Sequence, residues 1–286
     1  MDAISTRTGW RALGLVPYFA DAARLPAEDA LALPSLVGKR GGGGARIVVL
    51  AYPRISNFDD LDPLRLEPGV DVRFLRPGEP IQGNADLVIL PGSKATIADL
   101  EALRGCGWDI DLAGHVRRGG RVLGICGGFQ MLGRRIADPD GSEGPPGAVE
   151  GLGLLDIETR LGGDKVLGNV RGVSVETGVS FKGYEMHIGR TWGPGCGRPL
   201  LRFEDGRVDG AVGDGGRVAG CYVHGLFSDD AQRGAWLAVL DARRVGFDYE
   251  AEVEAILDRL AAHLEAHVAC DALLGLAREP RFMLPD

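Results

Sequence analysis

The stretch that decides the fold is Arg121-Val-Leu-Gly-Ile-Cys-Gly-Gly-Phe-Gln-Met-Leu-Gly133. Its first five residues have the apolar, β-branched character of a strand, and the pattern after Cys126 predicts a helix over about 128–136. Glycines on both sides of the cysteine permit the sharp, strained turn that exposes a nucleophile between a strand and a helix. The helix N-terminus favours a thiolate and directs backbone N–H groups at a developing oxyanion. We therefore interpret Cys126 as a nucleophile, with a buried structural cysteine as the alternative.

The segments around this stretch predict an α/β fold. Apolar runs at 46–52, 70–75 and 86–90 predict three strands before the one at 121–125, and helical patterns occupy about 95–104 and 109–118. Such alternation indicates a parallel-centred sheet with flanking helices. Further short strands predict a partly antiparallel extension of the sheet: 152–158, 166–175, 180–189, 200–204, 207–212 and 217–223.

The two ends of the chain differ from this core. We predict a short edge strand at Leu13–Tyr18, a helical turn at Leu25–Leu33 and a flexible linker at Gly41–Gly44. After the core come an amphipathic helix from Asp229 to about 244 and a long helix or helix pair over 249–276. The predicted organisation is an end piece with its linker (1–44), a main domain (45–245) and a helical extension (246–286), with a surface loop at 138–149.

Composition excludes several classes of protein. The net charge of −8 and the lack of a basic block argue against nucleic acid as the partner. No apolar run approaches the roughly 20 residues of a membrane span, and the N-terminus has no signal-peptide pattern, so we expect no membrane partner and a cytoplasmic location. The five cysteines fit neither a disulfide framework nor a CxxC metal site. His263 and His267 are four residues apart but have no third ligand, so no metal is expected.

A cysteine nucleophile needs a base, and His224 is the best candidate. It follows the strand at 217–223 and precedes Gly225, which puts it on the same sheet rim as Cys126. A histidine that merely caps a strand is the alternative. His187 lies with Tyr184 and Glu185 in the run 183–189, where Glu185 and His187 point to one face. These three residues either orient substrate or belong to a half-buried strand.

The run Pro91-Gly-Ser-Lys-Ala-Thr96 ends the third strand. The amides of Gly92 and Ser93 could complete an oxyanion hole with the amide of Gly127, and Gln130 joins them as an expected glutamine-binding residue. A plain turn with a capping serine is the alternative. The spacing is not that of a phosphate-binding loop.

The chain resembles the class I glutamine amidotransferase domain of the cobyric acid synthase family. Five motifs carry the resemblance, in the family's order, and together with the similarity of Leu25–Leu33 they cover nearly the whole chain. They are Pro53–Asp62, Leu90–Ile97, Gly124–Gly133, Gly183–Gly189 and Tyr222–Phe227. The Arg-Ile-Ser-Asn-Phe and His-Gly-Leu-Phe runs favour this family over cobyrinate diamide synthases.

The resemblance implies a flavodoxin-like fold with Cys126 as nucleophile and His224 as base. Many related amidotransferases place a glutamate two residues after the histidine, where this chain has Leu226, as the resembled family does. The group that orients the imidazole therefore stays open, with Glu185 as a hypothesis.

The resemblance also implies a function and partners. The domain would take ammonia from glutamine for the ATP-dependent amidation of the b, d, e and g carboxylates of adenosylcobyrinic acid a,c-diamide. Family members carry an N-terminal amidoligase domain with a phosphate-binding loop, which is missing here, and residues 1–44 resemble its tail. ATP and Mg²⁺ are expected at that domain, and no cofactor on this chain. The corrin would be reached through the amidoligase domain or subunit.

Three other classes of function remain open for this protein. One is a glutaminase subunit for a different acceptor, either cobyrinate or a cell-wall lipid precursor. The second is a cysteine hydrolase of the same fold that transfers no ammonia, and the third is a non-catalytic regulatory module.

Overall fold

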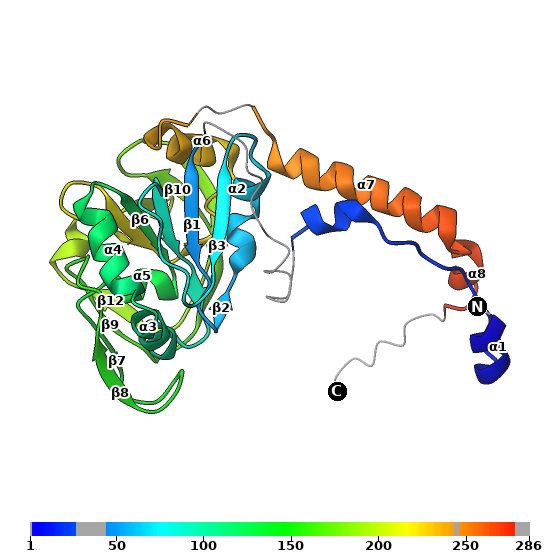
Figure 1. The fold of residues 1–286 in the computed structure, drawn as a ribbon, viewed down its shortest axis with the longest axis horizontal. Coiled ribbons are helices and arrows are strands. Elements are labelled where there is room, and N and C mark those ends of the chain that lie inside the picture. The colour runs from blue at the N-terminus through cyan, green and yellow to red at the C-terminus, as the bar shows by residue number, and fades with distance from the viewer. Residues whose placement is uncertain (1, 27–43, 243–245, 278–286) are drawn as a thin grey trace. The chain divides into compact units, whose positions relative to one another are not determined.

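The computed structural model describes residues 2–26, 44–242 and 246–277 (Figure 1). The chain divides into two compact units. A terminal unit combines Met1–Pro26 with Glu250–Asp286, and a main unit covers Ala27–Tyr249. The domain boundaries expected from the sequence stay a prediction.

The main unit is built on a six-stranded sheet in the order β15-β16-β6-β4-β1-β3. Neighbouring strands are parallel except β15, which runs antiparallel to β16. Both faces are covered, so the strands read as continuous apolar runs, such as the four buried residues of β4. The four strands expected up to residue 125 are therefore confirmed. The strand bounds are Arg46–Leu50 (β1), Asp71–Leu75 (β3), Leu87–Leu90 (β4), Arg121–Ile125 (β6), Ala211–Val212 (β15) and Val218–Cys221 (β16).

Helices α3, α4 and α5 lie together against the sheet, and α2 lies beside β3 (Figure 1). The two helices expected at about 95–104 and 109–118 are confirmed as α3 and α4. His115, on α4, is buried, and its Nε2 lies 3.0 Å from the Arg121 carbonyl oxygen. The helix bounds are Asp62–Leu66 (α2), Thr96–Gly105 (α3), Trp108–Arg117 (α4), Gly127–Met131 (α5) and Asp230–Val239 (α6).

The helix expected over 128–136 is wrong beyond its first turn. Helix α5 ends at Met131, and Arg135–Asp138 form strand β7 between β8 and β9. Gly133 makes this reversal possible, because a Cβ there would lie 2.8 Å from the Ile157 carbonyl oxygen. Backbone pairing with strands remote in sequence outweighs the local helical pattern.

Most of the expected antiparallel strands form sheets of their own. One has the order β14-β13-β10-β11-β17 and another β12-β9-β7-β8. The expected strand at 217–223 instead joins the main sheet as β16, parallel to β6, and β15 adds an antiparallel edge to it. The strand expected at 152–158 is wrong, because pairing starts only at Glu158, and the expected loop at 138–149 contains part of β8. The bounds are Gly147–Glu150 (β8), Glu158–Arg160 (β9), Val166–Ser174 (β10), Ser180–His187 (β11), Arg190–Trp192 (β12), Pro194–Gly197 (η4), Leu201–Phe203 (β13), Val208–Asp209 (β14) and Val223–His224 (β17).

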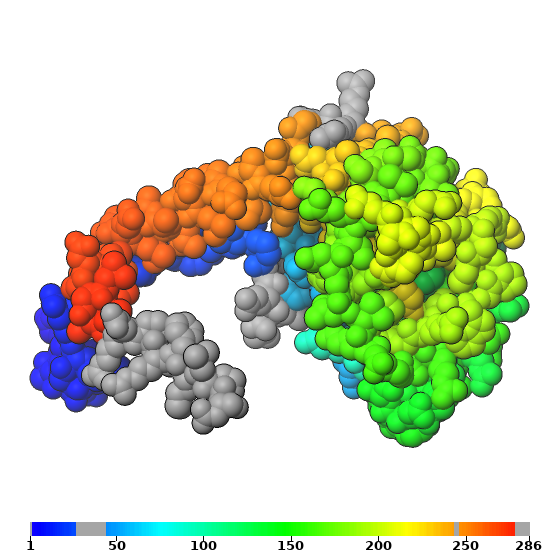
Figure 2. All heavy atoms as spheres, turned by 180° about the vertical axis from the view of Figure 1, so that it is seen from behind, coloured from blue at the N-terminus to red at the C-terminus, as the bar shows by residue number. Residues whose placement is uncertain are grey.

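The terminal unit consists of α1 (Asp2–Thr8), η1 (Ala20–Arg24), α7 (Tyr249–His267) and α8 (Cys270–Leu274). The N-terminal segment runs antiparallel beside α7, as the blue and orange parts of Figures 1 and 2 show. The expected helix pair is confirmed. The strand expected at 13–18 is reduced to one bridge between Gly14 and Val268. Most of the turn expected at Leu25–Leu33 and of the linker at Gly41–Gly44 lies outside the described residues.

All five cysteines are free. Within the described ranges, none of the helices has the length and apolar character that a membrane crossing requires.

Candidate active site

The site lies where three parallel strands end side by side. In the main sheet β6 is flanked by β16 and β4, and the carboxyl ends of these strands lead into Cys126, His224 and Gly92. Open α/β sheets bind their ligands at this edge. The sequence predicted that His224 lies on the same rim as Cys126, and the structure places both residues there together with Gly92.

Cys126 occupies a strained elbow between β6 and α5. Its φ of 51° and ψ of −111° are costly for a residue with a side chain, by about 1–3 kcal/mol. The glycines around it are sterically required, because a Cβ on Gly128 would lie 1.9 Å from the Leu90 carbonyl oxygen. The strain persists because β16 holds the elbow, with the Cys126 amide donating to the Cys221 carbonyl at 2.8 Å.

His224 is buried beside the elbow and is held by a carboxylate that sequence reasoning missed. Its Nδ1 lies 2.7 Å from Oδ2 of Asp60, and the other carboxylate oxygen accepts a hydrogen bond from the Gly225 amide at 2.7 Å. Asp60 belongs to the short helix η3 (Phe58–Leu61) after the first strand. The only signal for it in the sequence was its place in the Pro53–Asp62 motif.

The charge on His224 is set by competing effects. Burial lowers the pKa of the imidazole, but the Asp60 carboxylate and the Cys126 thiol together raise it to about 10. The remaining ring nitrogen, Nε2, is buried and has no hydrogen-bond partner among the described residues. A protonated imidazole next to a thiol is the arrangement that stabilises a thiolate nucleophile.

Tyr184 contacts the base and not the pocket. It is paired with His224 across β11 and β17, and the two rings stack with centroids 5.1 Å apart and planes 18° apart. Its hydroxyl accepts a hydrogen bond from Nδ2 of Asn57 at 2.9 Å. Asn57 has a left-handed φ of 49° and immediately precedes η3. The contact therefore connects the residue that precedes the Asp60 helix to β11, the strand that pairs with the one carrying His224.

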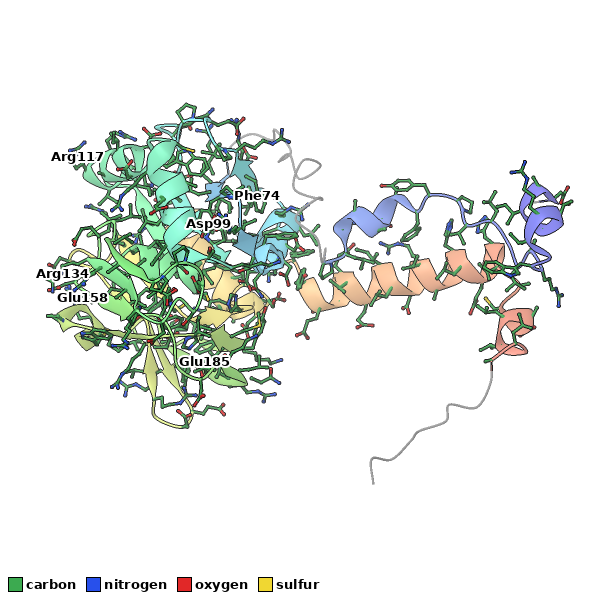
Figure 3. The ribbon with its side chains drawn as sticks, turned by 90° about the horizontal axis from the view of Figure 1, so that it is seen from below. Phe74, Asp99, Arg117, Arg134, Glu158 and Glu185 are labelled. Carbon is green, nitrogen blue, oxygen red and sulfur yellow. The ribbon has the colours of Figure 1, made fainter. Side chains whose placement is uncertain are left out.

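Glu185 does not orient the imidazole, so that hypothesis is wrong. Its Oε2 pairs with Arg207 at 2.9 Å, while Asp60 occupies the imidazole nitrogen. Figure 3 labels Glu185 on its strand. The role in orienting substrate stays a prediction for this residue.

A cavity of about 320 Å³ opens beside Cys126. Its lining residues are Ser56, Asn57, Ser93, Lys94, Thr96, Cys126, Gly127, Gln130, Ser142, Glu143, Lys165, Met186, His187 and Ile188. A Cβ on Gly127 would lie 3.0 Å from the Ser93 nitrogen, so two of the three predicted oxyanion donors are adjacent. Gly92 is near the base, because a Cβ on it would lie 3.5 Å from Cε1 of His224. The Ser93 hydroxyl accepts from the Ala95 amide and donates to Asp99, but it does not cap α3, whose N-cap residue Ala95 has no side-chain capping hydrogen bond.

Gln130 and His187 both line this cavity. The amide of Gln130 is held by three partners: Thr96 Oγ1 donates to it, and its Nε2 donates to the Ile188 carbonyl and the Tyr222 hydroxyl. The ring of His187 stacks on Tyr222 at 3.8 Å, and burial lowers its pKa. Both residues therefore form a wall of fixed shape, and their contact with glutamine stays a prediction.

Sequence reasoning also missed Glu143, in the loop at 138–149. Asp138 accepts hydrogen bonds from the amides of Ser142 and Glu143, and Glu143 then accepts one from the Thr96 amide at 2.6 Å. Burial raises the pKa of its carboxyl. A loop expected to lie at the surface thus contributes an acid to the cavity.

The described residues include no group of three potential metal ligands. In the terminal unit, His263 and His267 instead contact backbone carbonyl oxygens of Pro17 and His263.

Known proteins resemble this chain along most of its length. The cobyric acid synthase of Bradyrhizobium sp. (strain ORS 278) is 64% identical over 280 residues, which are 98% of this chain and 56% of that protein. The cobyric acid synthase of Methylobacterium nodulans is 62% identical over 97% of this chain and 57% of its own length. This chain therefore spans somewhat more than half of the curated relatives it matches.

Among solved structures, PurLQS from Thermotoga maritima aligns with 76% of this chain and all of its own chain, at a TM-score of 0.50 and 19% identity, which supports the fold alone. The model of the CobB/CobQ-like glutamine amidotransferase domain matches residues 46–232. Since that match covers well over half of the chain and contains the elbow, the buried histidine and its carboxylate, the chain belongs to the CobB/CobQ-like glutamine amidotransferase domain family.

Proposed function

We propose that this chain is the glutaminase part of a cobyric acid synthase and supplies ammonia from glutamine for the amidation of corrin carboxylates. The glutaminase part of this proposal rests on one observation. Cys126, His224 and Asp60 lie in series at one edge of the sheet, with Oδ2 of Asp60 2.7 Å from Nδ1 of His224. The amidation of corrin carboxylates rests on the relatives that are 56–64% identical to this chain over the aligned residues, because they are named cobyric acid synthases.

The first chemical step is attack by the Cys126 thiolate on the side-chain amide carbon of glutamine. The carbonyl oxygen becomes an oxyanion, which amides near Gly92, Ser93 and Gly127 would stabilise. The close approach of Gly127 to the Ser93 nitrogen supports this part of the proposal. Protonated His224 then donates a proton to the leaving nitrogen, so ammonia departs and a thioester remains.

Water completes the cycle. His224, now neutral, takes a proton from water as it attacks the thioester, and glutamate leaves while the thiolate is restored. Glutamine and water thus give glutamate and ammonia. Asp60 keeps the imidazole oriented and stabilises its charged form in both steps.

ATP and Mg²⁺ have no assigned place on this chain. In the proposed enzyme ATP, with Mg²⁺, would activate the corrin carboxylate on the amidoligase portion, and ammonia would pass to that carboxylate. The acceptors would be the b, d, e and g carboxylates of adenosylcobyrinic acid a,c-diamide. Cobyrinate and a cell-wall lipid precursor remain alternative acceptors, and the names of the relatives favour the corrin.

The test of the glutaminase assignment is Cys126→Ala. We expect ammonia release from glutamine to fall by at least about 10³-fold with the melting temperature unchanged, because the nucleophile is removed from an intact site. A glutamine-like chloroketone should label Cys126 in the unaltered chain and none of the other four cysteines. Retained activity in the variant would refute the assignment, and cleavage of other amides as fast as glutamine would indicate a general cysteine hydrolase.

A further inference from the structure

The cavity beside Cys126 contains charged side chains that the chemistry at the thiol does not use. Of the described residues that line it, Lys94, Lys165 and Glu143 carry a full charge. Both lysines are exposed, whereas Glu143 is half-buried. Attack by the thiolate and the proton transfers of the imidazole involve none of these groups. The three charges are therefore available to bind a part of the substrate away from the reacting amide.

The loop that carries Glu143 has a fixed conformation. The carboxylate of Asp138, which is buried at the end of β7, accepts hydrogen bonds from the amides of Ser142 and Glu143 at 2.8 and 2.9 Å. Burial raises the pKa of Asp138, but these amides outweigh it and hold the pKa below its ordinary value. A charged carboxylate enclosed by backbone donors keeps the loop in place. The side chain of Glu143 therefore enters the cavity from a defined point.

Thr96 connects Glu143 to the elbow. Its amide donates to Oε2 of Glu143 at 2.6 Å, and its hydroxyl donates to Oε1 of Gln130 at 3.1 Å. A Cβ on Gly127, the residue after Cys126, would lie 3.2 Å from that hydroxyl oxygen. A single residue thus separates the carboxylate from the backbone next to the nucleophile. Extended glutamine can bridge such a span, since its amide carbon and its α-nitrogen are about 5 Å apart.

The surroundings of Glu143 favour a cation. Burial raises the pKa of its carboxyl against the hydrogen bonds from Thr96, and the carboxylates of Asp138 and Asp99 raise it further. A positive group beside this carboxyl would offset the repulsion between like charges and favour the ionised form. A carboxylate accepts several hydrogen bonds, so the one from Thr96 leaves room for further donors.

We propose that Glu143 recognises the α-ammonium group of glutamine, while Lys94 and Lys165 attract the α-carboxylate and the side-chain amide lies at Cys126. The cavity then selects a free amino acid over an amide that lacks the α-ammonium group. A glutamine residue inside a peptide has neither of the two charges and is a poor substrate for the same reason. That the amino acid is glutamine rests on the proposed function, while recognition of the α-ammonium group does not.

The test combines one substitution with two substrates. Glu143→Gln keeps an oxygen that accepts from the Thr96 amide but loses the charge. We expect kcat/KM for glutamine to fall by about 10–100-fold, mostly through KM, which is the value of a hydrogen bond between charged groups. For glutaramic acid, which is glutamine without the α-amino group, the change should be less than about twofold. Glu150→Gln, at an exposed position of β8, is the control and should change neither substrate.

Alkylation of Cys126 measures the same recognition without hydrolysis. The reagents are a glutamine-like chloroketone and the same chloroketone without its α-amino group, and mass spectrometry follows the modified cysteine. The unaltered chain should react at least about tenfold faster with the reagent that has the amino group. Glu143→Gln should remove most of that difference, with a melting temperature equal to that of the unaltered chain.

Three results would overturn the proposal. The first is an equal loss for glutamine and glutaramic acid in Glu143→Gln, which would leave the side chain with only a structural contact to Thr96. The others are equal alkylation of the unaltered chain by both reagents and a preference that Glu143→Gln does not change. A chain whose alkylation depends on Glu143 but which releases no ammonia from glutamine would refute the proposed function and leave the recognition intact.

Discussion

Asp60 is the residue on which the chemistry of the site depends most after the nucleophile and the base. Its two carboxylate oxygens fix the imidazole and the Gly225 amide, so both the ring and the strand end are held. The resemblance to class I amidotransferases predicts the orienting carboxylate elsewhere, since many of them are expected to carry a glutamate two residues after the histidine. Here Leu226 stands at that position. The carboxylate comes instead from Asp60, which lies 164 positions before His224 in the sequence.

Asp60→Asn should lower kcat by about 10²–10³-fold while KM for glutamine changes little, because the amide favours the wrong tautomer and loses the charge. Without the Asp60 carboxylate, burial lowers the pKa of His224. The pH at which activity is lost on the alkaline side should therefore fall below about 10. Glutaminase pH profiles measure both effects. Asp59→Asn is the control, and an unchanged profile for Asp60→Asn would contradict the role given to Asp60.

The contact between Asn57 and Tyr184 should act as one unit. Tyr184→Phe keeps the stacked ring but loses the hydrogen bond, and Asn57→Gly removes the same bond without straining a backbone with φ 49°. Each should lower kcat about fivefold, the value of one hydrogen bond, and the double variant should be no slower than either single one. Additive losses in this double-mutant cycle would show that the two residues act separately.

At the scale of elements, the elbow is a close junction of β6, α5 and β4. Gly128 faces the Leu90 carbonyl so closely that a methyl group cannot be accommodated without moving one of these elements. The position of Cys126 is thus set by the contact between a helix and a strand, and not by the cysteine alone.

Gly128→Ala should destabilise the fold by about 3 kcal/mol or more, since a Cβ would overlap backbone atoms that cannot move independently. Gly144→Ala is the matched control, because a Cβ there meets no atom within 4 Å. Urea unfolding followed by circular dichroism compares the two. Similar midpoints for both variants would mean that the elbow adjusts easily.

At the scale of the whole molecule, the formal net charge counts every carboxyl group as ionised, although the fold buries some of them. Burial raises the pKa of Asp209 to about 6, although the Tyr222 amide donates to it at 2.8 Å. Its pKa in the unfolded chain is about 4, so between these values the folded state binds more protons than the unfolded one. Stability from this group is therefore present below about pH 4 and is lost as the pH rises through 6.

Asp209→Asn should consequently raise the free energy of unfolding at pH 8 by on the order of 2 kcal/mol and have little effect at pH 4. The amide oxygen can still accept the Tyr222 hydrogen bond, and the charge that burial disfavours is gone. Chemical denaturation at the two pH values measures the difference. Destabilisation at pH 8 would show that the charged carboxylate is required by its backbone donors.

His224 acts on stability in the same direction as Asp209. Its pKa is raised above the ordinary value near 6.5, so its contribution to stability is complete below that value and is lost as the pH rises toward 10. Asp209 and His224 therefore both contribute less to stability as the pH rises.

The sequence by itself determined the parallel core, the elbow and the pair of Cys126 and His224, because these depend on local signals: apolar strand runs, flanking glycines and the ends of strands. It misjudged residues 132–138, where pairing with β8 and β9 overrides a helical pattern. Only the tertiary structure revealed Asp60 and Glu143. Asp60 is 164 positions from its partner, and the direction of its side chain depends on how η3 packs beside the sheet. Contacts between distant segments leave no periodicity in the sequence, so the nucleophile and base are predictable while the groups that hold them in place are not.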